Sequence, residues 1–160
     1  MSARGRSWVL PVSVVLALLL GLLPMPAMLQ PLRPYWLALV VAYWVIEDSE
    51  RVGLGFAFAA GLVADVAFGG LLGEQALRLV VMTFILQRFR TQLRFFPMPQ
   101  QALSIGGLLL NDRVVAAALH LVLGLPQYPW LYWIAPLVGM ALWVPLFLGF
   151  DALRQVRRPR

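Results

Sequence analysis

Six apolar stretches dominate this chain, and they limit its possible folds more than any other feature. The first is the longest, since residues 7–32 contain no charged side chain at all. A helix of about 20 apolar residues crosses the ~30 Å hydrocarbon core of a bilayer. The charged share is 12%, about half that of an average soluble domain, and the mean hydropathy is +0.81. A soluble fold of 160 residues could not cover so much apolar surface, so the sequence predicts an integral membrane protein.

We expect one all-α membrane domain over residues 1–160, built as a bundle of six transmembrane helices. The second and fourth stretches are short for a full crossing, unless flanking residues contribute or the bilayer thins. Tyr35–Trp36 and Tyr43–Trp44 bracket the second stretch, which predicts aromatic belts at the two interfaces. After the fourth stretch, "RFRTQLRFFPMP" predicts an amphipathic segment lying at the interface. The expected spans are 8–29, 34–46, 53–73, 76–87, 101–123 and 132–150.

The basic residues, which are all arginine, predict the orientation in the membrane. With the N-terminus inside, six spans place ten arginines in cytoplasmic segments and only Arg33 and Arg78 on the opposite side. Cytoplasmic loops carry such an excess, so both termini are expected in the cytoplasm. A five-span arrangement would put some of these arginines on the wrong side. The charge is thus explained by topology rather than by nucleic acid, and we expect an uncleaved first span rather than a cleaved signal peptide.

The third stretch carries small residues at every fourth position around one acid. Ala57, Gly61, Asp65, Gly69 and Gly73 would follow one face of a helix, and such spacing lets helix backbones approach closely. The face could pack within this chain or against the helix of a partner. An unpaired charge at the bilayer centre costs at least ~2.5–3.5 kcal/mol, so Asp65 should face the bundle and find a partner. Its candidate partners are Arg78, Asn111, Arg113 and His120.

The fifth stretch carries a second polar group, "NDR", and a histidine. Asp112 and Arg113 are neighbours about 100° apart on a helix, so at least one should point into the bundle, in the direction of Asp65. His120 lies two turns further on and is expected to be a hydrogen-bonded residue rather than a metal ligand. No cofactor, metal or catalytic residue is expected, because the chain contains no HExxH motif, no phosphate-binding loop and no cysteine.

Three stretches together resemble the MreD family of rod shape-determining membrane proteins. They are "RPYWLALVVAYW", "RVGLGFAFAAGLVADVAFGGLLGEQAL" and "QRFRTQLRFFPMPQQAL", in this order and spacing. The resemblance implies a fold similar to the substrate-binding subunits of ECF vitamin transporters. Tyr35 departs from the family, which often has an acid or another polar residue there. By position, the resemblance implies that eight residues have structural or partner-facing roles. They are Arg33, Pro34, Trp36, Tyr43, Trp44, Gly61, Asp65 and Gly73.

The resemblance also implies a non-enzymatic role in the cell-elongation machinery that directs lateral-wall peptidoglycan synthesis. The implied partners are the transmembrane helix of MreC, the RodA and class B penicillin-binding-protein synthase, and indirectly MreB. The alternative is a membrane solute-binding or transport subunit in which Asp65 and Arg113 face a polar cavity. A cavity of a few hundred Å³ lined by both residues would favour this alternative over the scaffold.

Overall fold

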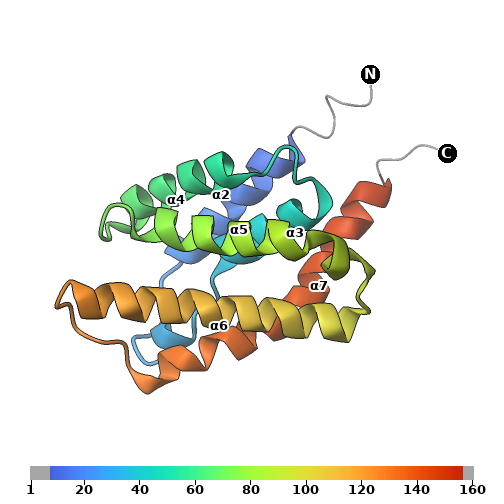
Figure 1. Ribbon diagram of the computed structural model, residues 1–160. Coiled ribbons are helices and arrows are strands. Elements are labelled where there is room, and N and C mark those ends of the chain that lie inside the picture. Colours follow the sequence, from blue (N-terminus) through green and yellow to red (C-terminus); the bar gives the residue numbers. More distant parts are fainter. Residues whose placement is uncertain (1–7, 157–160) are drawn as a thin grey trace.

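The computed structural model describes residues 8–156, which fold into six α-helices, two 3₁₀ turns and no strand (Figure 1). Successive helices run in opposite directions, and the described chain begins and ends at the same end of the bundle. The basic N-terminal residues and the last four residues of the predicted cytoplasmic tail lie outside the described part. In chain order the elements are α2 (Val9–Leu22), η1 (Gln30–Leu32), α3 (Trp36–Glu47), α4 (Leu54–Phe68), α5 (Glu74–Phe95), α6 (Met98–Val122), η2 (Trp130–Trp133) and α7 (Ala135–Val156).

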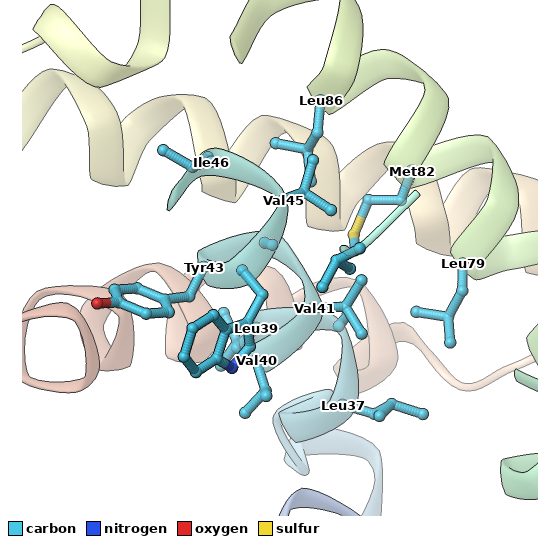
Figure 2. Close-up of a cluster of buried hydrophobic side chains, with 14 of the residues drawn as sticks. Leu37, Leu39, Val40, Val41, Tyr43, Val45, Ile46, Leu79, Met82 and Leu86 are labelled. Atoms are coloured by element: carbon cyan, nitrogen blue, oxygen red, sulfur yellow. The ribbon is translucent and has the colours of Figure 1, made fainter. Parts of the chain in front are cut away.

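Helix α3 forms the centre of the bundle, which explains its short length. Every residue from Leu37 to Ile46 is buried, and α2, α5 and α7 pack around the helix. Figure 2 shows Val41 and Val45 of α3 lying beside Met82 and Leu86 of α5. A helix that is apolar on all sides must be surrounded by other helices. The second stretch is therefore the core of the fold rather than a short lipid-facing span.

The predicted aromatic belt at the end of α3 is wrong. Tyr43 and Trp44 have exposed fractions of 0% and 3%, so neither reaches an interface. Tyr43 stacks on Phe150 with a centroid distance of 4.8 Å, and the Trp44 indole N–H donates to the hydroxyl of Ser13 at 2.9 Å. The indole needs a hydrogen-bond partner because it is buried, and the serine in α2 provides one.

The outer faces of the other helices expose many large apolar side chains, although the second half of α5 also exposes Arg88 and Arg94. This arrangement suits a bundle surrounded by lipid, because a soluble protein rarely exposes such continuous apolar surface. Two helical stretches, Met98–Val122 and Trp130–Leu153, are long and apolar enough to cross a membrane, while α2 and α4 are apolar but shorter. Large exposed apolar side chains occur on all five, for example Leu16, Phe58, Phe84, Leu103 and Leu148.

The helix limits differ most from the predicted spans at the ends of α2, α4, α5 and α7, and α7 continues to Val156, past the predicted limit at 150. Helix α2 ends at Leu22 rather than near residue 29, because Pro24 and Pro26 cannot continue a helix. Helix α4 ends at Phe68, five residues before the predicted limit at 73. Helix α5 continues without a break to Phe95, so the arginine-rich segment expected at the interface is the second half of this helix. There the Arg90 side chain donates to the carbonyl of Ile46 at 3.1 Å and so caps the end of α3.

Candidate functional site

A polar cluster lies in the half of the bundle that is remote from the described chain ends (Figure 1). The turn between α4 and α5, the second half of α6, the start of α3 and the segment around η2 contribute its side chains. Four of its charged side chains, Asp65, Arg78, Asp112 and Arg113, are buried, which requires paired or hydrogen-bonded groups. The cluster contains Arg33, Tyr35, Asp65, Glu74, Gln75, Arg78, Asp112, Arg113, His120, Tyr128 and Tyr132.

Asp65 caps the following helix instead of forming an ion pair. Its two carboxylate oxygens accept hydrogen bonds of 2.8 Å from the backbone amides of Gly73 and Gln75, and the residue is 2% exposed. The first amides of a helix have no partner within it, and a carboxylate there also interacts favourably with the helix dipole. Asp65 therefore holds the start of α5 against the end of α4, and its partners are not among the four predicted side chains.

The line of small residues is divided between two roles. Ala57 and Gly61 are buried in α4, and a Cβ on Gly61 would lie 2.8 Å from the carbonyl carbon of Gln75 and still closer to the backbone of Ala76. Gly61 therefore lets α5 approach within the chain. Gly69 and Gly73 instead form the turn between the helices, with positive φ angles of 65° and 96°, which glycine adopts readily. The prediction that these two glycines belong to one helix face is wrong.

Arg78 and Asp112 form a buried ion pair between α5 and α6. The Arg78 Nε atom lies 2.9 Å from Oδ1 of Asp112, and a terminal nitrogen lies 2.6 Å from Oδ2. Two parallel bonds to one carboxylate give a strong and directional contact. Glu74 lies 3.8 Å from the same guanidinium, and the ring of Tyr35 covers it at 4.7 Å. Arg78 is thus an internal residue that pairs with Asp112 and not with Asp65, for which it was a candidate partner.

Arg113 points into the bundle without a carboxylate partner among the described residues. It is 8% exposed, its guanidinium lies 3.8 Å from the centre of the Tyr132 ring, and it donates to the backbone oxygen of Arg33 at 3.4 Å. The expectation that at least one residue of "NDR" would face inward is confirmed, since Asp112 is buried as well. Neither side chain, however, bonds to Asp65.

His120 joins the outer end of the cluster. Its Nδ1 atom faces the carbonyl of Pro126 at 3.1 Å, and Nε2 lies 2.8 Å from the Tyr128 hydroxyl. The Tyr128 hydroxyl also lies 3.1 Å from Glu74, and burial raises the pKa of its phenol. A carbonyl only accepts hydrogen bonds, so His120 carries a hydrogen on Nδ1. The single hydrogen of the Tyr128 hydroxyl is then shared between two acceptors, Nε2 of His120 and the Glu74 carboxylate. Within the described residues, no group of three metal-ligating side chains occurs here or elsewhere.

A cleft of about 190 Å³ opens beside the buried arginines. Its walls include Arg33, Arg78 and Arg113, and a shallower depression of about 580 Å³ lies on the other side of Arg78, Arg113 and Tyr132. Asp65 lines neither of them. A solute-binding subunit was expected to have a cavity lined by both Asp65 and Arg113. The cleft found here is lined by Arg113 but not by Asp65.

The remaining residues marked by the family resemblance lie at both ends of α3. Arg33 donates to the carbonyls of Gly21 and Leu23 and so caps the end of α2. Pro34 and Trp36 line the cleft beside it, whereas Tyr43 and Trp44 belong to the core at the other end. Tyr128 and Tyr132 of the cluster carry no motif in the sequence and follow a turn. Only the hydrogen bonds and ring contacts of the folded chain identify them.

The fold and the cluster define an all-helical membrane protein with a polar cleft at one end of its bundle. The sequence model of the family described as rod shape-determining protein MreD matches residues 2–152. The chain is also 30% identical to the "Rod shape-determining protein MreD" of Haemophilus influenzae over 144 residues, which cover 90% of this chain and 87% of that protein. The chain belongs to the MreD family, and this membership supports a role in rod-shape determination. No solved structure matches it, so the likeness to ECF substrate-binding subunits stays a prediction.

Proposed function

We propose that this protein is a non-enzymatic scaffold of the rod-shape complex in the bacterial inner membrane. In this role it crosses the membrane several times, with both termini in the cytoplasm. It holds the transmembrane helix of MreC beside RodA and the class B penicillin-binding protein, and it influences MreB only indirectly. The family match over residues 2–152 carries this proposal. The apolar outer faces of the bundle support it, because they offer contact to partner helices within the bilayer.

The outer face of α4 is the surface best suited to a partner helix. Gly55 and Ala59 are exposed and four residues apart, and no atom lies within 4 Å of the position that a Cβ on Gly55 would take. Association of helices in lipid depends on close packing, which small residues at this spacing permit. The predicted face with Gly61 cannot serve, since α5 already covers it. We therefore assign the MreC contact to the face with Gly55 and Ala59.

A leucine at position 55 tests this assignment. Gly55→Leu should strongly reduce co-purification of MreC and the rod shape of cells that depend on the variant, because the larger side chain separates the helices. Gly107→Leu is the matched control: Gly107 is exposed on α6 with open space around it, but Leu103 and Asn111 flank it at four-residue spacing. Normal MreC recovery with Gly55→Leu, at wild-type protein levels, would contradict the assignment to this face.

The cleft at Arg113 favours a second candidate function, that of a membrane solute-binding or transport subunit. A polar cavity of this size with convergent charged groups is typical of ligand sites. The absence of Asp65 from its walls removes the charge pair on which that candidate was based. Cells carrying Arg113→Gln would separate the two functions: loss of solute uptake with normal MreC recovery supports the subunit, and normal uptake supports the scaffold.

A further inference from the structure

All the charged side chains that line the cleft beside Arg113 are cationic. Three arginines line it, namely Arg33, Arg78 and Arg113, and no acidic residue is among the described residues of its walls. Arg78 is neutralised by Asp112 behind it. Arg33 bonds to neutral backbone carbonyls, and Arg113 has no carboxylate partner within the described chain. Arg113 therefore lacks a counter-charge in a buried place, whereas Arg33 is half-buried and interacts with the carboxyl end of α2.

Buried charge without a partner is costly, so such an arrangement indicates that a partner is supplied from outside the chain. Arg113 is 8% exposed and has one long hydrogen bond, of 3.4 Å, to the backbone of Arg33. A guanidinium presents five donors, most of which remain free here for an anion. Arg33 lines the same cleft, although its guanidinium already donates to the carbonyls of Gly21 and Leu23, so Arg113 is the arginine with free donors.

The hydroxyl of Tyr132 is a second and independent sign of a missing ligand. Tyr132 is 6% exposed and lines the cleft, and its hydroxyl has no hydrogen-bond partner within residues 8–156. Buried hydroxyls without a partner are uncommon in native structures. Its ring position is fixed, since it stacks on Tyr128 at 3.8 Å and under Arg113 at the same distance. A ligand oxygen in the cleft would give this hydroxyl an acceptor.

The other wall of the cleft is apolar and combines the central helix α3 with α2 and α4, which expose apolar side chains on their outer faces. Ala17 and Gly21 of α2, Leu37 of α3 and Phe68 of α4 line it. The cleft lies where several helices end, which is the depth of lipid headgroups in a spanning bundle. We propose that this cleft binds the anionic phosphate headgroup of a membrane lipid, with Arg113 and the Tyr132 hydroxyl on the phosphate, the charge of Arg33 beside it and the apolar wall along the chains. The site does not depend on whether the protein scaffolds MreC.

Lipid retention by single-residue variants tests the proposal. The full-length protein would be placed in phosphatidylcholine nanodiscs with a small share of phosphatidylglycerol, and bound lipid would be measured by native mass spectrometry after release. The wild-type protein should retain phosphatidylglycerol in preference to phosphatidylcholine. Arg113→Gln should weaken retention about tenfold or more, and Tyr132→Phe about two- to tenfold, as expected for charged and neutral hydrogen bonds. Arg51→Gln is the matched control, because this half-exposed arginine pairs with Asp48 outside the cleft.

The tyrosine variant keeps the test decisive if Arg113→Gln fails to fold. Removing a hydroxyl without a partner should leave the melting temperature in lipid-free detergent unchanged, so weaker retention would report the lost ligand contact. Equal retention of phosphatidylglycerol by the wild-type protein, Tyr132→Phe and Arg51→Gln would overturn the proposal. Inorganic phosphate alone forms the second arm. If it stabilises the wild-type protein as well as the lipid does and displaces the lipid, the ligand is a free anion and the lipid assignment is wrong.

Discussion

Asp65 shows how one carboxylate can be kept in an apolar helix without a cation beside it. Both oxygens accept amide hydrogen bonds, from Gly73 and Gln75, so its hydrogen-bonding capacity is largely used. The same two bonds satisfy orphan donors at the start of α5. Burying the carboxylate costs free energy. Its hydrogen bonds offset this cost, because they also give partners to two backbone amides that would otherwise be unpaired at the start of α5. This arrangement explains the acid structurally and does not require an ion path.

The loss of stability on substitution of Asp65 should increase with the number of backbone amides that are left without a hydrogen-bond partner. Asp65→Asn keeps one oxygen acceptor, whereas Asp65→Leu leaves both amides without a partner. We expect a loss of about 1–2 kcal/mol for asparagine and about twice that for leucine. Thermal unfolding in detergent measures both variants under one condition. A larger loss for asparagine than for leucine would contradict the capping role and argue for a charge-dependent role such as ion coupling.

At the residue scale, the sequence indicates which side chains are special but not which of them meet. The small-residue pattern and the cost of buried charge select Asp65, Asp112 and Arg113 correctly as internal residues. Their partners depend on the register between helices, which a single sequence does not contain. The sequence thus does not show that Asp112 bonds to Arg78. Nor does it show that Asp65 bonds to backbone amides, because every residue except proline has one.

The contact between α4 and α5 depends on close approach of the two backbones. Gly61 lies where the backbone of Ala76 and Gln75 leaves no room for a Cβ. Gly107 lies in α6 with open space around it. A side chain at position 61 would therefore clash with α5, whereas a side chain at position 107 would not, although both glycines lie in helices.

Alanine at these two positions should change the stability in opposite directions. Gly61→Ala forces the helices apart and should cost about 1–3 kcal/mol, as overpacking does. Gly107→Ala should stabilise by about 0.5–1 kcal/mol, because alanine favours the helix over glycine. The shift of the melting temperature in detergent is the measurement for each. Equal shifts for both variants would show that α5 does not approach α4 as closely as the structure has it.

At the element scale, apolar runs predict that helices exist but leave their lengths open. Six stretches were expected and six α-helices form within the described chain, yet α5 absorbs the arginine-rich segment that was assigned to the interface. The glycines at 69 and 73 would extend α4 by their spacing alone. They end it instead, because a left-handed turn is available only to such residues.

The described molecule has an apolar core and largely apolar outer faces, and its charge is concentrated in the polar cluster, in the loop between α3 and α4 and in the second half of α5. Such a molecule is stable only where lipid covers the outer faces. The alternation of helix direction then places the loop before α4 at the same end as the start of α2 and the end of α7, and the turn before η2 at the opposite end (Figure 1). Arginine counts from the sequence predict that the end with the termini is cytoplasmic.

Cysteine labelling tests this orientation directly, since the chain has no cysteine of its own. Glu50 and Gln127 are exposed in loops at the two ends of the bundle. In intact spheroplasts, a membrane-impermeant maleimide should label Gln127→Cys and should reach Glu50→Cys only after the membrane is opened, because the inner membrane excludes the reagent. Labelling of Glu50→Cys alone would invert the orientation. Equal labelling of both sites in sealed cells would place the two loops on one side, which a bundle of alternating spans cannot do.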